Sequence, residues 1–243
     1  MSSRLFASGL VLTATCLAAA AEGAPCQSQS PATRTPVIEL YTSEGCSSCP
    51  PADRWLSTLK QASAAGQVVV QGFHVSYWDS LGWVDRFAAP AHNARQREIA
   101  TRQGASNVYT PQLVRDGRDS RDYGAARADR NEAAGAVIRL AWHQDQAAAD
   151  VTPRIAGARW AAYWTVTEHG HASKVRSGEN AGEFLQHDFV VRQFVPAGTH
   201  EGPHRLVLRP LPGEPGHARQ VNLVVFDPAD GRPLQALSLQ CAG

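Results

Sequence analysis

Two cysteines separated by two residues, Cys46 and Cys49, restrict the architecture of this chain more than any other motif. They follow a β-rich run at 37–41 and precede a helical pattern at 52–63, where apolar residues recur on one face. Free N–H groups and the positive dipole end of a helix N-terminus favour a thiolate. The segment therefore predicts a redox pair, with Cys46 as the more exposed, attacking sulfur and Cys49 as the sulfur that resolves a mixed disulfide.

Two prolines, Pro50 and Pro51, follow the pair directly. A residue before proline is disfavoured in the α conformation. Two arrangements follow from this: the helix begins near Pro51 with the dithiol in the loop before it, or the first helical turn is distorted. A negative charge on Glu44 would also oppose a thiolate on Cys46. Both effects predict that Cys46 is less activated than the cysteine of a strong oxidant.

The first half of the chain alternates between β-rich and helical patterns. A third and a fourth element are expected at 68–76 (strand) and 89–104 (helix), followed by a strand at 111–117 and a short strand near Tyr123. A long amphipathic pattern predicts a further helix over 128–149. Alternation of this kind indicates an α/β fold with a mixed or parallel sheet.

The composition changes near residue 151. Short alternating or β-branched runs, separated by turns rich in Gly and Pro, continue to the C-terminus. Regular short strands without helices predict an antiparallel β-sandwich. The expected organisation is an α/β domain over 36–150 and a small β-sandwich domain over 151–243.

The N-terminus has the pattern of a targeting segment. Arg4 precedes an apolar run of small residues that ends in a small-residue cleavage pattern, which predicts a signal peptide over 1–21 and a flexible leader over 22–35. The run is short and rich in alanine, so no stable membrane span is expected after signal removal. The protein is therefore predicted to be exported, either periplasmic or secreted.

Export changes the expectation for the five cysteines. Cys16 would leave with the signal peptide, and an even number in an oxidising compartment favours disulfides. Cys46 and Cys49 are neighbours, so Cys26 and Cys241 are predicted to form a structural disulfide near the two termini; two free terminal thiols are the alternative. Closing so long a loop contributes about 5 kcal/mol in the chain-entropy model.

Several stretches resemble the exported thioredoxin-like family catalogued as domain of unknown function 1223. They are VIELYTSEGCSSCPPAD, GFHVSYWDSLGWVDRFA, ARQ, VYTPQLVRDG, GENAG with VVR, and DGRPLQA. The resemblance implies a thioredoxin-like mixed sheet flanked by helices, followed by a small antiparallel β-sandwich domain. The family has no assigned reaction. The sequence departs from the family pattern at Ser76, where an acidic residue is expected.

The same resemblance gives a role to Thr110 and Pro111, which directly precede a strand. It implies a cis-proline beside the dithiol, where the backbone of the preceding residue pairs with a substrate chain. The alternative is an ordinary proline at the start of a strand. Tyr109, Trp78 and His74 are predicted to bind substrate from the loops around the dithiol. An aromatic cluster that only caps the sheet is the competing interpretation.

The leading function is thiol–disulfide exchange with a protein or a small thiol or disulfide as substrate. A binding module with a permanent Cys46–Cys49 bridge and a copper carrier that uses the same thiols are the alternatives. Arg95 is expected either near the dithiol or on a solvated helix face. The net charge of +1, without a cluster of Lys and Arg, argues against nucleic acid as a partner. No metal site is predicted among the histidines, because they lack ligand spacing on a helix. No cofactor is predicted either.

Overall fold

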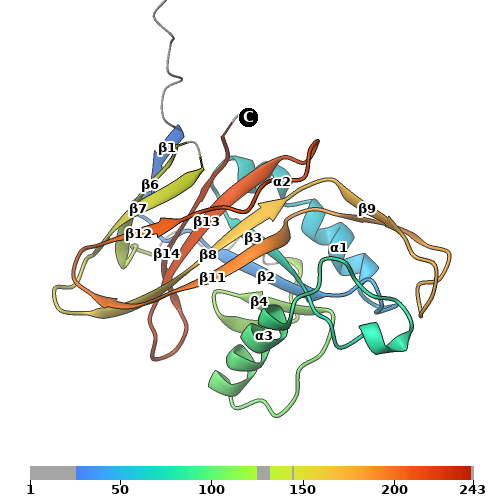
Figure 1. The fold of residues 1–243 in the computed structure, drawn as a ribbon. Coiled ribbons are helices and arrows are strands. Elements are labelled where there is room, and N and C mark those ends of the chain that lie inside the picture. The colour runs from blue at the N-terminus through green and yellow to red at the C-terminus, as the bar shows by residue number, and fades with distance from the viewer. Residues whose placement is uncertain (1–25, 125–131, 144, 242–243) are drawn as a thin grey trace, which may run out of the picture.

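The computed structural model describes residues 26–124, 132–143 and 145–241 (Figure 1). The predicted signal peptide at 1–21 lies outside these residues. The helices within them are α1 (Pro50–Ser57), α2 (Lys60–Ala64), α3 (Pro90–Arg102) and the short 3-10 helix η1 (Asp79–Leu81). The strands are β1 (Cys26–Gln29), β2 (Val37–Thr42), β3 (Val69–His74), β4 (Gln112–Arg115), β5 (Arg118–Ser120), β6 (Ala136–His143), β7 (Gln146–Pro153), β8 (Arg159–Glu168), β9 (His171–Lys174), β10 (Phe184–His187), β11 (Val190–Glu201), β12 (His204–Leu208), β13 (Arg219–Phe226) and β14 (Pro233–Leu239).

One sheet of eight strands dominates the described residues, in the order β14-β13-β8-β11-β3-β2-β4-β5. β3 pairs in parallel with both β2 and β11, and the other neighbours are antiparallel. A second sheet has the order β1-β6-β7-β12, and β9 and β10 form a separate ribbon. In Figure 1 this ribbon extends beyond the large sheet on the side of α1.

The predicted fold class, a thioredoxin-like mixed sheet flanked by helices with a separate β-sandwich domain after it, is wrong. The described chain is mostly β, with large sheets of many strands. The eight-stranded sheet includes strands from both predicted domains, because β3 pairs directly with β11. The boundary expected between residues 150 and 151 falls inside β7.

The helix predicted over 128–149 is also wrong where the structure describes this segment, which forms the hairpin of β6 and β7. Ala136, Ile138 and Leu140 are buried, while Arg139 between them is exposed. This is the two-residue period of a strand. Small alanines suit these strands because they share a core with bulky side chains of β8 such as Trp164, and this packing overrides the helix propensity of alanine.

The predicted leader contains a strand. β1 pairs antiparallel with β6, with Cys26 opposite Trp142. The structure joins Cys26 to Cys241 by a disulfide with an S–S distance of 2.10 Å, which is the pairing that the sequence predicted. This bond fastens the edge of the four-stranded sheet to the segment that follows β14.

Several buried apolar clusters support the sheets. The largest lies between the four-stranded sheet and strands β8, β13 and β14, and it includes Trp160 and Trp164, both fully buried. The smaller cores lie on opposite faces of β2 and β3. Leu56 of α1 packs against one face, and Ile99 of α3 packs against the other. The dithiol segment lies between β2 and α1, so both of its ends are held by buried contacts.

An ion pair fastens α3 to the large sheet. Arg95 is 7% exposed, and its Nε and Nη2 donate to the two carboxylate oxygens of Glu39 at 2.9 and 2.6 Å. Tyr41 and Tyr163 also donate to Glu39, at 2.7 and 3.0 Å. The structure therefore places Arg95 in neither of its expected settings, since it is buried and paired. No helix of the described residues is long and apolar enough to cross a membrane.

Candidate functional site

The two cysteines of the motif are joined to each other and buried. The Cys46–Cys49 disulfide has an S–S distance of 2.25 Å, and both residues are 0% exposed. Ser47 and Ser48 between them are exposed. The prediction that Cys46 is the more exposed of the two is therefore wrong for this closed state, because both cysteines are equally buried.

Helix α1 begins immediately after the disulfide. Cys49 is the N-cap residue, with φ −77° and ψ −38°, and Pro50 is the first helical residue. Prolines are tolerated in the first turn because the N–H groups they lack have no partner within a helix. The carbonyl of Cys49 accepts hydrogen bonds from the N–H groups of Ala52 and Asp53 at 2.9 and 3.2 Å. The dithiol therefore lies at the helix N-terminus, where the dipole favours a thiolate.

A segment far away in the sequence covers the disulfide. We call residues 177–182, between β9 and β10, the cover loop. The amide of Asn180 donates to the carbonyl oxygens of Glu44 and Cys46, at 2.8 and 3.0 Å. Glu179 accepts a hydrogen bond from the N–H of Ser47 at 3.0 Å, and Ser177 donates to the carbonyl of Gly82. Asn180 is 5% exposed, so its amide is desolvated and makes these two hydrogen bonds in place of hydrogen bonds to water.

Three ionisable side chains are buried next to the disulfide. Glu44 accepts hydrogen bonds from Trp83 Nε1 at 2.7 Å and His187 Nε2 at 3.2 Å. The Nδ1 atom of His187 has no hydrogen-bond partner among the described residues and lies 3.9 Å from Asp53 Oδ2. Asp53 also accepts a hydrogen bond from Thr42 at 3.1 Å. Glu44, His187 and Asp53 therefore form a buried chain of acid and base groups.

The pKa values of the two acids are shifted in opposite directions. Burial raises the pKa of Asp53, against the opposing charges of His187 and His74. Burial also acts to raise the pKa of Glu44, but hydrogen bonds from His187, Ser173 and Trp83 bring that pKa below its ordinary value. Asp53 is therefore suited to exchange a proton, while Glu44 stays ionised.

His74 lies in the same buried region instead of on a surface. Its Nδ1 is 2.6 Å from Asp85 Oδ2, and its ring centre is 4.9 Å from that of His187. Asp85 also accepts a hydrogen bond from the N–H of Glu44 at 2.9 Å. Burial acts to lower the pKa of His74, but the charge and hydrogen bond of Asp85 raise it above its ordinary value. His74 is 2% exposed, so its contacts in this state are with the protein.

The other predicted substrate-binding residues form a half-buried strip beside the dithiol. Trp78 Nε1 donates to Thr110 Oγ1 at 2.8 Å. A Cβ atom on Gly45 would lie 3.0 Å from the Cβ of Trp78, so the backbone next to Cys46 approaches this tryptophan closely. The Thr110–Pro111 peptide bond is cis, as the family resemblance implied. Trp78 therefore links the dithiol turn to Thr110 and Pro111.

Tyr109 completes this strip at its outer end. Its hydroxyl donates to Asp119 Oδ1 at 2.6 Å, and its carbonyl accepts a hydrogen bond from Gln96 at 2.9 Å. Burial and the hydrogen bond to Asp119 raise the pKa of Tyr109 to about 12, so its hydroxyl stays protonated.

Sequence reasoning missed the roles of His187, Asp53 and Asp85. Asp53 lies within α1, Asp85 lies in the loop between η1 and α3, and His187 ends β10. These local positions carry no information about a contact such as that of Glu44 with His187, which are 143 positions apart in the sequence.

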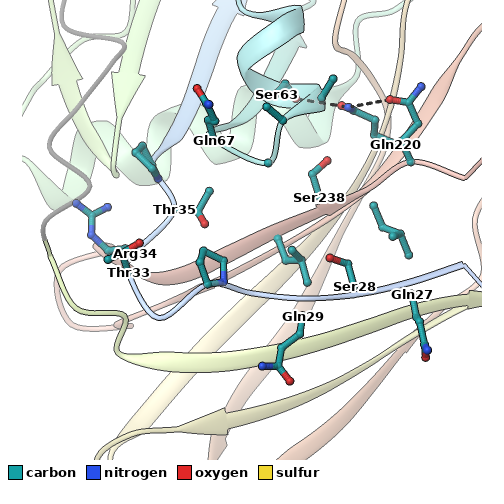
Figure 2. Close-up of a pocket in the computed structure, with 18 of the residues that line it drawn as sticks. Gln27, Ser28, Gln29, Thr33, Arg34, Thr35, Ser63, Gln67, Gln220 and Ser238 are labelled. Carbon is teal, nitrogen blue, oxygen red and sulfur yellow. Dashed lines mark hydrogen bonds between the residues drawn. The ribbon is translucent and has the colours of Figure 1, made fainter.

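A cavity of about 790 Å³ lies elsewhere, between β1, α2 and β14. Figure 2 shows that its labelled lining is mostly uncharged and polar, with Gln27, Ser28, Gln67, Gln220 and Ser238 around the space. The described residues that line it include none of the dithiol site. It adjoins the Cys26–Cys241 disulfide and offers no reactive group of its own, so the covered dithiol is the candidate functional site.

Two solved structures are similar in fold to this chain. No protein with a curated description matches this chain. The crystal structure of protein AGR_C_4864 from Agrobacterium tumefaciens is similar over 85% of this chain and 94% of its own, with a TM-score of 0.64 and 23% identity. HBP35 of Porphyromonas gingivalis is similar over 86% of this chain and 76% of its own, with a TM-score of 0.55 and 14% identity. At these identities the likeness concerns the fold alone.

The family assignment rests on the sequence. The family model described as protein of unknown function (DUF1223) matches residues 37–226, which include the dithiol, Thr110 and Pro111, and the cover loop. The chain therefore belongs to the DUF1223 family.

Proposed function

We propose that this protein is exported and carries out thiol–disulfide exchange through Cys46 and Cys49. The observation that carries the proposal is the buried chain of Glu44, His187 and Asp53 next to the disulfide. Buried ionisable groups are costly to a fold unless they are paired, and they concentrate at functional sites.

The position of the disulfide in the chain supports a role other than stability. The positions of Cys46 and Cys49 in the sequence differ by 3, whereas those of Cys26 and Cys241 differ by 215. In the chain-entropy model, closing the short loop contributes about 2 kcal/mol and closing the long loop about 5 kcal/mol. The terminal disulfide thus suits a structural role, and the short one suits exchange.

The exchange oxidises the Cys46–Cys49 dithiol and reduces the substrate disulfide. In the reduced protein, the Cys46 thiolate attacks one sulfur of a substrate disulfide, and the other substrate sulfur leaves as a thiolate and takes up a proton. Cys49 gives its proton to Asp53 and attacks Cys46 Sγ of the mixed disulfide. The second substrate thiolate then leaves and is protonated. Two electrons pass from the dithiol to the substrate, and the reverse sequence reduces Cys46–Cys49.

Asp53 is well placed for this proton transfer. It follows Cys49 by one helical turn, so the two side chains lie on the same face of α1. Burial raises its pKa, which makes its carboxylate a better proton acceptor. His187 connects Asp53 to Glu44 and so gives the proton a second buried carrier.

Access to the disulfide requires a movement of the cover loop. Both sulfurs are buried in the closed state, and the contacts of Asn180, Glu179 and Ser177 hold the loop over them. Trp78, Thr110 and Pro111 form the adjacent half-exposed strip on which a substrate chain would lie. A substrate therefore binds to this strip while the loop opens.

The burial of both sulfurs also favours a second candidate, a binding module in which Cys46–Cys49 is a permanent bridge. The two functions are separated by a trapping experiment on the full mature chain with oxidised glutathione. In a Cys49→Ser variant, exchange at Cys46 stops at the mixed disulfide, which mass spectrometry detects as one glutathione per chain. A Cys46→Ser variant should give a markedly lower yield.

The control is a Cys26→Ser, Cys241→Ser variant, which keeps the short disulfide. After mild reduction it should oxidise as fast as the wild type. The proposal fails if two results are found under the same conditions: Cys49→Ser forms no adduct, and the Cys46–Cys49 disulfide of the cover-loop variant Asn180→Ala stays unreduced. That outcome would assign the bridge to structure.

A further inference from the structure

The cavity of about 790 Å³ between β1, α2 and β14 lies outside the dithiol site. Its lining is uncharged except for Arg34, which pairs with Asp116 at 2.8 Å and with Glu132 at 3.0 Å. Glutamine, serine and threonine make up most of the other lining residues (Figure 2). Such a lining offers many hydrogen bonds and no free charge, so it suits a neutral ligand. We propose that an extended, uncharged segment of a partner polypeptide binds in this cavity.

Two strand edges without a neighbouring strand meet at this cavity. β1 is the outermost strand of the four-stranded sheet, and β14 is the outermost strand of the eight-stranded sheet. Residues of both strands line the cavity. The Cys26–Cys241 disulfide holds the two edges together at one end, with a Cα–Cα distance of 5.8 Å. A free edge presents backbone N–H and C=O groups that can pair with an added chain.

The pairing of each strand identifies the free backbone groups. Directly after β1, the N–H of Ser30 donates to a carbonyl of β6, so by alternation Gln27 and Gln29 direct their backbone groups away from β6. In β14, the carbonyl of Leu234 accepts a hydrogen bond from outside the sheet, so Ser238 faces outward as well. None of the described residues pairs with these outward groups of Gln27, Gln29 and Ser238, and all three residues line the cavity.

The chain itself shows how the β14 edge can hold a backbone segment. Gln235 of β14 accepts a hydrogen bond from the N–H of Thr35 at 2.8 Å, and its Nε2 donates to the carbonyls of Pro31 and Thr33 at 2.9 and 3.1 Å. A side-chain amide matches a peptide backbone because both offer a donor and an acceptor. The segment 31–35 is thus bound next to the cavity through its backbone, and the free edge continues from there toward the disulfide.

Gln220 offers a second amide on this path, and no backbone segment meets it. This residue lines the cavity and is 3% exposed, and its Oε1 has no hydrogen-bond partner among the described residues. Its Nε2 makes only long hydrogen bonds, to Ser63 Oγ at 3.4 Å and Gln240 Oε1 at 3.5 Å (Figure 2). Exchanging the nitrogen and oxygen of this amide would leave a donor without a partner instead of an acceptor. A buried amide held so loosely can turn toward a bound chain, which would satisfy it.

The cavity and the dithiol lie at opposite ends of β2. Pro36, which lines the cavity, directly precedes this strand, whereas the turn of Cys46 follows its last residue, Thr42. A strand of six residues spans about 20 Å. β1 has four residues, so a segment of about that length can pair along it. The bound segment is therefore separate from the substrate strip of the proposed function, and its binding can be measured without thiol chemistry.

The experiment titrates the oxidised, ¹⁵N-labelled full mature chain with acetyl-Ser-Gln-Ser-Gln-Ser-Gln-amide and follows the NMR signals. Saturable shifts should appear at the side-chain amides of Gln220 and Gln240 and at the backbone of Gln27. Gln240→Ala removes one amide, and Gln27→Pro removes one outward N–H at a strand edge, where proline is tolerated. Each loses one hydrogen bond, so each should weaken binding by about 5-fold. A peptide with Glu or Lys in place of Gln should bind more weakly than the neutral one.

Gln61→Ala is the matched control, because this exposed glutamine of α2 lies outside the lining of the cavity. It should bind the peptide as the wild type does. The proposal is overturned if the neutral peptide causes no saturable shifts in the folded wild type, or if Gln240→Ala binds as tightly as Gln61→Ala. Where Gln27→Pro does not fold, Gln240→Ala gives the decision. Shifts confined to Trp78 and Thr110 would also overturn it, as would binding of maltose, but not of the peptide, at the same amides.

Discussion

The amide nitrogen of Asn180 donates a hydrogen bond to the carbonyl oxygen of Cys46 at 3.0 Å, across 134 residues of sequence. The same nitrogen donates to Glu44 at 2.8 Å. A side chain from the loop between β9 and β10 thus holds the backbone of the disulfide turn, whose two cysteines are 0% exposed. In the function proposed above, access to the dithiol therefore depends on the opening of this loop.

Replacing Asn180 should expose the disulfide. Asn180→Ala removes two hydrogen bonds, each with a net contribution of about 1 kcal/mol, so loop closure weakens by about 2 kcal/mol. Where loop opening limits the reaction, the rate of Cys46–Cys49 reduction by dithiothreitol should rise by about 30-fold. Quenching with an alkylating reagent and mass spectrometry gives this rate. Asn107→Ala, at an exposed asparagine, is the control and should react at the wild-type rate.

The buried pair of His74 and Asp85 should make stability depend on pH. Burial acts to raise the pKa of Asp85, but the charge and hydrogen bond of His74 lower it overall, while Asp85 raises the pKa of His74. The Asp85 contribution is present above about pH 4 and is lost as the pH falls. The His74 contribution is present below about pH 6.5 and is lost as the pH rises through the raised pKa of the folded state.

Asp85→Asn should therefore cost more stability at about pH 5.5 than at about pH 9. Urea unfolding of the oxidised protein at the two pH values measures the difference. Asp145→Asn changes an exposed carboxylate in the turn after β6 and should show no such dependence. If Asp85→Asn lowered the free energy of unfolding equally at both pH values, His74 and Asp85 would not form a charged pair in the folded protein.

The ion pair of Arg95 and Glu39 is expected to be essential for the fold. Arg95→Ala leaves Glu39 buried without its cation, which costs about 3 to 5 kcal/mol. Arg97→Ala, on the exposed face of the same helix, should change the free energy of unfolding by less than about 0.5 kcal/mol. Urea unfolding compares the two variants. A small cost for Arg95→Ala would show that Tyr41 and Tyr163 alone satisfy Glu39.

The sequence predicted the local features around the dithiol well. The strand at 37–41, the helix after the cysteines and the cis bond before Pro111 all appear at the expected places. The strand and the helix depend on short-range signals, namely a β-branched run and the period of the apolar residues. The cis bond was implied by the resemblance to thioredoxin-like proteins and not by a local signal. The predicted helix at 52–63 is split near Thr58, whose hydroxyl donates to the carbonyl of Trp55 at 2.6 Å.

The fold class failed because it depends on contacts between distant segments. Alanines in β6 and β7 resemble a helix locally, and only their packing against β8 makes them strands. The pairing of β3 with β11 joins Gly72 to Val190 and cannot be read from either segment alone. For the same reason the partners of Glu44, which are His187 and the cover loop, were not predicted.

The two disulfides should contribute unequally to stability. The chain-entropy model gives about 5 kcal/mol for the bond that closes the long loop and about 2 kcal/mol for the short one. Cys26→Ser with Cys241→Ser should therefore lower the free energy of unfolding more than Cys46→Ser with Cys49→Ser. Urea unfolding under non-reducing conditions compares the pairs. The reverse order would assign the structural role to Cys46–Cys49.

The reduction potential of Cys46–Cys49 tests the central claim most directly. The full mature chain is equilibrated with dithiothreitol redox buffers, and alkylation followed by peptide mapping reports each disulfide separately. An exchanging dithiol should have a potential above about −300 mV, while Cys26–Cys241 stays oxidised in the same buffers. A Cys46–Cys49 potential below about −300 mV, with Cys26–Cys241 reduced first, would contradict the account and identify the motif as a structural bridge.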